Sequence, residues 1–146
     1  MVEIISSFGS AIAESLAPIP VFVGTSAEPF LNPFSHSRGG AYPHPPSRQV
    51  TPAPVFIVFP SVPGSFNESI QTFLQQKTKD IAHAIQQRAV QLGQSRWDDL
   101  LYPNYALANT PLQLMYGSNV PKLNAIAQKY DPNSVMHLAG GFKFGG

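Results

Sequence analysis

The sequence predicts an α+β domain, a small antiparallel sheet covered by helices, and three observations lead to this fold class. Apolar residues recur at helical spacing in residues 2–16 and 68–92, and in a shorter segment, residues 119–130. A continuous apolar run at residues 54–60 lies between prolines and has the length of a strand. With 146 residues, the chain has the length of one domain, so we expect residues 1–146 to form a single domain.

The first segment predicts a short amphipathic helix followed by a brief strand. In residues 2–16 four apolar side chains fall three or four positions apart and so share one helical face: Ile5, Phe8, Ile12 and Leu16. Pro18 and Pro20 end this helix, because proline removes a backbone donor and fixes φ. The sequence "VFV" at residues 21–23 is typical of a strand, which Gly24 ends.

A proline-rich segment, residues 28–54, separates this strand from the next one. Its prolines exclude a regular helix or a central strand. Its aromatic residues favour packing over disorder, so we expect an ordered loop near a binding site. The run "PVFIVFP" at residues 54–60 then predicts a strand covered on both faces.

Two further helices complete the expected fold. The sequence "SFNE", from Ser65 to Glu68, matches a capping box and predicts the start of a long helix that ends at Leu92, before Gly93. A shorter helix over residues 119–130 has proline in its first turn. We expect the long helix and this shorter one to cover the sheet. The glycine-rich residues 141–146 predict a flexible tail around two anchoring phenylalanines.

Composition excludes several classes of protein. Hydrophobic residues make up 43% and charged residues 12%, which excludes a disordered chain. With a net charge of +1, the chain has no excess of basic residues to bind the phosphates of nucleic acid, so we do not expect a nucleic-acid-binding protein. The absence of cysteine removes disulfides and thiol nucleophiles. No signal peptide and no apolar run of about 20 residues is recognisable, so we expect a cytoplasmic protein without a membrane segment.

The histidines are weak candidates for metal binding or acid–base catalysis. His36 and His44 share the proline-rich loop, but no carboxylate stands beside them, so we expect no metal site. Imidazole titrates near neutrality and can serve acid–base catalysis from a loop, although both residues also fit ordinary loop positions. His83 lies off the apolar stripe of the long helix, where a solvated surface position is the simpler interpretation.

The segment "YPNY" holds the remaining candidates, Tyr102, Asn104 and Tyr105. Pro103 favours an extended residue before it, so Tyr102 and Asn104 are expected to face one side and Tyr105 the other. A phenol donates, accepts or acts as an acid, and a carboxamide orients a carbonyl group. Buried, hydrogen-bonded tyrosines of a core are the alternative.

A family resemblance favours a functional site over a buried core position for these tyrosines. The sequences "YPNYAL", "MYGSNVPKLNAIAQKYDPNSVM" and "GGFKF" resemble the carboxyl-terminal end of the berberine-bridge-enzyme-like flavin oxidases, especially fungal ones. A weaker likeness of "APIP", "RGGAYP", the apolar strand and the long helix extends it over nearly the whole chain. The chain departs from the family where "PSVPGS" replaces an aromatic residue, commonly tryptophan, after that strand.

The resemblance implies that "YPNY" lies beside the flavin and the substrate, with Tyr102 and Asn104 facing the active centre. The flavin-binding domain of the family, with its cofactor-bonded histidine and frequent cysteine, is not found in these residues. We therefore expect no cofactor in this chain, with FAD present only if a partner chain supplies it. The candidate catalytic residues are Tyr102, Asn104, His44 and His36, and the candidate substrate-binding residues are Tyr42, Tyr105, Phe56 and Tyr116.

These expectations favour a cofactor-independent tailoring enzyme of secondary metabolism, which binds an apolar small molecule and promotes a non-redox isomerisation or cyclisation. One alternative is the carboxyl-terminal half of a split or truncated FAD-linked oxidoreductase, and another is a non-catalytic binding or scaffold remnant. Without the flavin domain an apolar surface would be exposed, which predicts a homodimer or another homo-oligomer. Neither nucleic acid nor a membrane is an expected partner.

Overall fold

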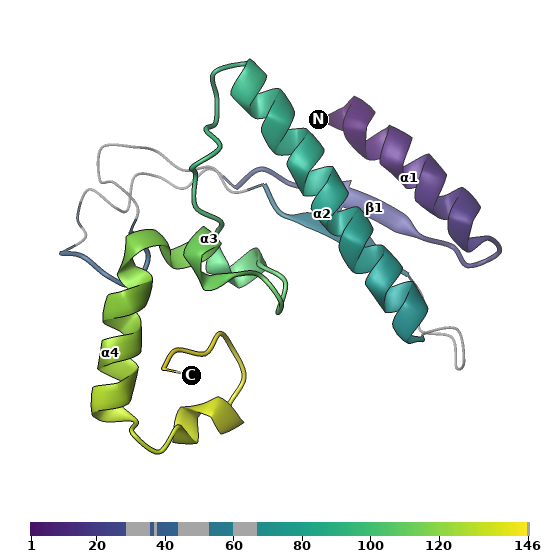
Figure 1. Ribbon diagram of the computed structural model, residues 1–146. Coiled ribbons are helices and arrows are strands. Elements are labelled where there is room, and N and C mark those ends of the chain that lie inside the picture. Colours follow the sequence, from purple (N-terminus) through teal and green to yellow (C-terminus); the bar gives the residue numbers. More distant parts are fainter. Residues whose placement is uncertain (29–35, 37, 44–52, 60–66, 146) are drawn as a thin grey trace. The chain divides into compact units, whose positions relative to one another are not determined.

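The computed structural model describes residues 1–28, 36, 38–43, 53–59 and 67–145 (Figure 1). The chain divides into two compact units. Unit 1 comprises Met1–Glu28 and Thr51–Asp99, and unit 2 comprises Pro29–Val50 and Leu100–Gly146. That residues 1–146 form a single domain, as the length of the chain predicts, stays a prediction.

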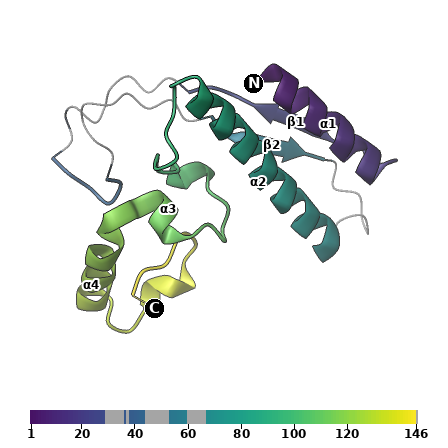
Figure 2. The same cartoon turned by 45° about the horizontal axis from the view of Figure 1, so that its top comes forward.

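Unit 1 is a small α+β layer, which confirms the predicted fold class. Its elements are α1 (Val2–Leu16), β1 (Phe22–Thr25), β2 (Val55–Val58) and α2 (Glu68–Gln91). The strands pair antiparallel, with Phe22 opposite Val58 and Thr25 opposite Val55. Helix α1 packs along β1, α2 packs along β2, and the two helices contact each other (Figures 1 and 2).

The apolar stripes predicted for both helices form the core of this unit. Ile12 on α1 and Ile81 on α2 are fully buried, and Val23 and Leu74 complete the buried cluster. Ile5, Phe8 and Leu16, the other predicted stripe residues of α1, pack against that cluster. The bounds of α1 agree with the sequence prediction.

The strands differ from their prediction in two respects. The expectation that both faces of the strand at residues 54–60 are covered is wrong, because burial alternates along β2 and leaves Phe56 and Val58 40% and 55% exposed. Gly24 lies inside β1 and does not end it. A Cβ atom at this position would stand 2.6 Å from the Phe56 ring, so the absence of a side chain lets that ring lie over the strand.

Helix α2 begins two residues later than a capping box with Ser65 as the N-cap would place it. Asn67 is the N-cap, and its side-chain oxygen accepts a hydrogen bond of 3.0 Å from the Ile70 backbone N–H. Ser65 itself lies outside the described residues. At the other end the prediction is confirmed, since Gly93 adopts φ +70° and its N–H donates to the Val90 carbonyl.

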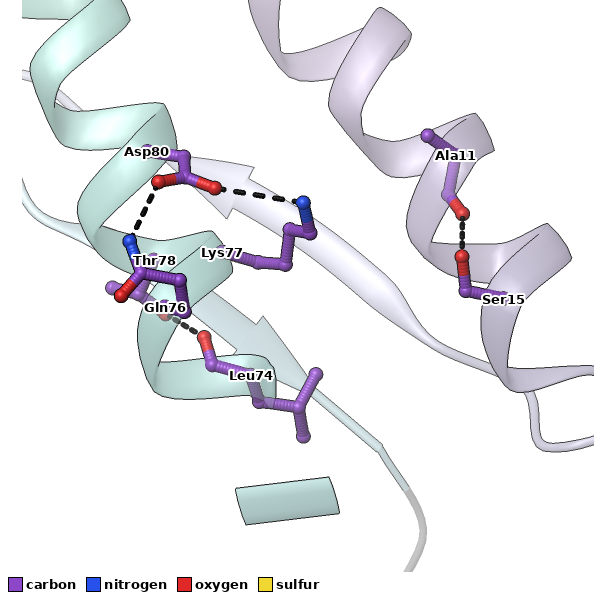
Figure 3. A network of polar contacts seen from close by, with 7 residues as sticks. All are labelled: Ala11, Ser15, Leu74, Gln76, Lys77, Thr78 and Asp80. Atoms are coloured by element: carbon purple, nitrogen blue, oxygen red, sulfur yellow. Dashed lines mark hydrogen bonds and ion pairs between the residues drawn. The ribbon is translucent and has the colours of Figure 1, made fainter. Parts of the chain in front are cut away.

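Short polar contacts line the two helices of unit 1 (Figure 3). On α2, the Gln76 amide donates to Asp80 at 2.8 Å, and Lys77 forms an ion pair with the same carboxylate at 3.5 Å. Hydroxyl groups of Thr78 and Ser15 donate to backbone carbonyls four residues earlier in α2 and α1. Each of these contacts stays within one helix, so none of them joins the two helices, and the two side-chain pairs with Asp80 stabilise α2.

Unit 2 consists of short helical segments. They are η2 (Pro103–Tyr105), α3 (Leu112–Tyr116), η3 (Gly117–Asn119), α4 (Val120–Tyr130) and η4 (Val135–Leu138). Helix α4 confirms the predicted short helix. The expectation that it covers the sheet stays a prediction, because α4 belongs to unit 2 and the sheet to unit 1. Within unit 2, α4 packs on α3 and η3, and within unit 1, α1 packs beside α2 on the sheet. The side chains of Met115 on α3 and Val120 on α4 are buried.

The carboxyl-terminal segment folds back on α4. Both carboxylate oxygens of Asp131 accept backbone N–H bonds at 2.8 Å, from Val135 and Met136, which starts η4. The Lys143 ammonium donates to the carbonyls of Met136, Ala139 and Gly140. The Gly145 N–H then donates to the Asn124 side chain at 3.0 Å. Contacts therefore hold the described part of the predicted flexible tail, residues 141–145.

Candidate functional site

Four predicted site residues meet in unit 2 and form a group that we call the tyrosine cluster: Tyr42, Tyr102, Asn104 and Tyr105. The Tyr102 ring makes edge-on contacts with Tyr42, at a centroid distance of 6.4 Å, and with Tyr105, at 5.3 Å. Edge-to-face pairs at such distances are favourable, because the positive ring edge meets the negative face. Tyr102 is thus the central ring of the cluster.

The backbone of "YPNY" determines this arrangement. Tyr102 precedes a proline and is extended, with φ −75° and ψ 119°, as the sequence predicts. The next three residues form the 3₁₀ turn η2, in which the Tyr105 N–H donates to the Tyr102 carbonyl at 3.1 Å. The predicted placement of Tyr105 on the side opposite Tyr102 is therefore wrong. A turn reverses the chain, whereas an extended segment would alternate its side chains.

Asn104 and Tyr102 are directly connected. The Asn104 amide nitrogen donates to the Tyr102 phenol oxygen at 2.8 Å. Asn104 is exposed and Tyr102 is half-buried, so the pair lies at the surface of unit 2. A hydroxyl group that accepts a hydrogen bond is polarised and becomes a stronger donor.

The loop that carries Tyr42 is fixed by a residue that sequence analysis did not assign to the site. The Asn119 amide donates to the carbonyls of Gly40 and Ala41, at 3.2 and 3.1 Å. The Tyr42 hydroxyl in turn donates to the Leu100 carbonyl at 3.2 Å. Asn119 lies in the predicted helix start, and no local pattern indicates a partner almost 80 positions earlier in the chain.

Among the described residues, Phe56 and Tyr116 make ring contacts with residues outside the cluster. Phe56 belongs to unit 1, where its ring packs against Phe22 at 6.0 Å. Tyr116 makes an edge-on contact with Phe144 at 5.1 Å. His36 is exposed, and the described residues give it no ring contact or hydrogen bond with the cluster. His44 lies outside the described residues.

Unit 2 also has a small hollow between α4 and the chain end, with a volume of about 120 Å³. It is lined by Ala127, Gln128, Asp131, Pro132, Ser134, Phe144 and Gly145. Clefts that enclose a drug-sized ligand measure about 300–1,000 Å³, so this hollow is too small to enclose one. None of the tyrosine cluster residues lines it.

Across residues 1–28, 36, 38–43, 53–59 and 67–145, no three histidine, aspartate or glutamate side chains gather in a way that would hold a metal ion. In the same ranges, no helix combines the length and the hydropathy that crossing a bilayer requires.

Comparison with protein-family models, with curated proteins and with solved structures found no match to the chain. The resemblance to the berberine-bridge-enzyme-like oxidases, with the site residues and cofactor status that it implies, therefore stays a prediction. The evidence for a functional site is therefore the geometry of the tyrosine cluster.

Proposed function

We propose that the chain binds a largely apolar small molecule at the tyrosine cluster and promotes its non-redox isomerisation or cyclisation. The observation that best supports this is the 2.8 Å hydrogen bond from Asn104 to the Tyr102 phenol oxygen. It joins a proton donor to a group that polarises it, beside the apolar rings of Tyr42 and Tyr105. Apolar walls with a few oriented polar groups are typical of small-molecule sites.

Each residue has a distinct role in this proposal. Tyr102 donates its proton to a carbonyl oxygen of the bound molecule, so the adjacent carbon skeleton becomes electron-poor. The Tyr102 phenolate then takes a proton from a carbon conjugated to that carbonyl, and the electrons of the broken C–H bond form the new double bond of a dienol. The dienol hydroxyl proton returns through Tyr102 to another carbon of the conjugated system, which restores the carbonyl, so the product is an isomer and no electrons are gained or lost. Asn104 holds the Tyr102 oxygen in place, and the neighbouring rings orient the skeleton.

A conjugated ketone, trans-chalcone, is a suitable first probe. We expect Tyr102→Phe to weaken the binding of trans-chalcone by about two- to tenfold, because the variant loses one hydrogen bond to the ligand carbonyl. The bound carbonyl should also stretch at higher frequency in the variant, because it loses its donor. Tyr130→Phe is the matched control, since it removes the same hydroxyl from an exposed tyrosine on α4.

Native mass spectrometry on chain purified from its source complements the probe. A retained small molecule that an equally folded Tyr102→Phe variant releases would support the proposal, and conversion of that molecule would identify the reaction. If neither chalcone nor a retained compound responds to Tyr102→Phe or Asn104→Ala, the site proposal is wrong, and a non-catalytic binding or scaffold role takes its place.

A second candidate is the partner-dependent half of an FAD-linked oxidoreductase, and the outer face of the unit 1 sheet favours it. Phe22 is 62% exposed there, next to the partly exposed Phe56 and Val58. Among the described residues the sheet has two strands, so each strand has an open edge. Small sheets of this kind usually gain stability when further structure covers them.

Affinity purification from the source distinguishes the two candidates. The second one requires a flavin-containing chain that co-purifies in fixed proportion and is lost when Phe22 and Phe56 are both replaced by serine. A tagged chain that binds its small molecule without such a partner contradicts the second candidate and leaves the first in place. The Leu138→Ser variant, which removes an exposed apolar side chain from unit 2, is the control.

A further inference from the structure

We propose that the short helix η4 carries an apolar patch that inserts into an anionic membrane surface. The patch, which we call the η4 patch, consists of Val135, Met136 and Leu138, all exposed, with Leu138 at 90%. In Figure 1, η4 is the short yellow helix that follows the turn after α4. A 3₁₀ helix has three residues per turn, so Val135 and Leu138 share one face. Grouped apolar side chains at a surface mark a protein or membrane contact, whereas singly scattered ones do not.

Hydrogen bonds hold the η4 patch in place. The Asp131 carboxylate accepts from the Val135 and Met136 N–H groups, both at 2.8 Å, which brings the end of α4 beside η4. The Lys143 ammonium donates to three carbonyls within residues 136–140, on the carboxyl-terminal side of η4. An unpaired backbone group is costly in an apolar medium. Paired backbone groups at both ends therefore suit a segment that enters a membrane.

Charge selects an anionic surface. Unit 2 holds five of the nine basic residues of the chain and one of its eight acidic residues, so its formal charge is +4, against −3 for unit 1. The net charge of +1 conceals this separation. Two of the five cations, Lys129 and Lys143, lie in or next to the segments that carry the patch. Each lysine close to an anionic membrane strengthens binding by about fivefold.

The end of α4 adds an amphipathic pair beside the patch. Tyr130 is exposed there, and the Lys129 ammonium lies 5.1 Å from the centroid of its ring. Tyrosine and lysine are both common where a protein meets the boundary between acyl chains and head groups, because each joins an apolar body to a polar end. The pair therefore fits the depth that lies just outside an inserted η4 patch.

An anionic membrane fits this surface better than the other partners. Nucleic acid would meet the lysines but leave the apolar side chains of the η4 patch without a matching surface. A second copy, paired through the same face about a twofold axis, would bring like-charged lysines together. A bilayer offers acyl chains and anionic head groups at once. Such binding needs no spanning helix, so this proposal replaces the sequence expectation that a membrane is not a partner.

The test is co-sedimentation of the full chain with vesicles of phosphatidylcholine, with and without phosphatidylserine. We expect binding to be at least about tenfold stronger with phosphatidylserine and to weaken at high salt, which screens the lysines. Leu138→Ser should weaken it by about tenfold or more, because one leucine is no longer buried, and Lys129→Gln by about fivefold. Leu92→Ser and Lys79→Gln, at exposed positions of unit 1, are the matched controls.

A fluorescent probe measures insertion directly. Trp97 is the single tryptophan, so Leu138→Trp in a Trp97→Phe background reports on the η4 patch alone. Its emission should shift to shorter wavelengths on anionic vesicles and be quenched by lipids with brominated acyl chains. A probe that does not respond would overturn the proposal, as would binding that Leu138→Ser and Lys129→Gln leave unchanged. Self-association without vesicles that Leu138→Ser abolishes would also overturn it, since the patch would then join copies of the chain.

Discussion

The two units of this chain are stabilised in different ways. In unit 1, apolar side chains at regular spacing on two helices and two strands are buried in one cluster around Ile12 and Ile81. In unit 2, short segments with few fully buried side chains are joined by hydrogen bonds from side chains to distant backbone groups and by edge-on aromatic pairs. Periodic patterns therefore describe unit 1 well and unit 2 poorly.

The distribution of aromatic residues makes this contrast measurable. Trp97 lies in unit 1, and all five tyrosines lie in unit 2. Tryptophan fluorescence thus follows unit 1, and ¹⁹F spectra of incorporated fluorotyrosine follow unit 2. The prediction for Ile81 uses the tryptophan signal and that for Asn119 uses both, and a comparison of the two signals also reveals whether the two units unfold together.

The largest effect is expected for Ile81→Ala. Its side chain is fully buried, so truncation leaves a cavity and should lower the free energy of unfolding seen by Trp97 by about 2–5 kcal/mol. Urea titration measures this loss. Gln87→Ala, at an exposed position of the same helix, should change it by less than about 0.5 kcal/mol. Equal losses in the two variants would contradict the assigned core.

Gly24→Ala should have the next largest effect. The new methyl group would stand 2.6 Å from the Phe56 ring, so the ring or the strand must move, at a cost of about 1–3 kcal/mol. In a Phe56→Ala background the same change should cost much less. Gly140→Ala is the control, because no atom lies within 4 Å of the added carbon. An unchanged cost in the Phe56→Ala background would show that the ring is not the obstacle.

Asn119→Ala tests the polar contacts of unit 2. The variant leaves the Gly40 and Ala41 carbonyls without this amide, which should cost about 1 kcal/mol in the fluorotyrosine signal. The Tyr42 resonance should shift most, because its loop is released. Asn109→Ala, at an exposed position of the same unit, is the control. A loss seen equally by Trp97 would mean that the units unfold as one.

The smallest effect is expected for Asp80→Asn. The Lys77–Asp80 pair has its atoms 3.5 Å apart and is about one-third exposed on both sides, so solvent screens it. Its removal should cost about 0.3–0.5 kcal/mol at low salt and nothing measurable at about 1 M salt. A larger, salt-independent loss would indicate a structural role for the carboxylate beyond this helical contact.

The candidate site was partly predictable. Tyr102, Asn104, Tyr105 and Tyr42 were identified from their residue types and from the family resemblance, and the structure brings them together. Asn119, which fixes the Tyr42 loop, was missed, because its contact joins residues far apart in the sequence. The same reason hid the stack of His83 on Trp97, since a helical pattern places His83 at the surface but does not indicate which residue covers it.

The sequence by itself determined the α+β class, the bounds of α1, α2 and α4 to within a few residues, and the apolar stripe that forms the core of unit 1. These features follow from spacing, capping and proline positions, which act over a few residues. Tertiary structure alone decided that α1 packs beside α2 on the sheet, that β2 has one open face, and that Tyr105 turns toward Tyr102. Such outcomes depend on which apolar faces and backbone groups find partners far along the chain, and no local pattern contains that information.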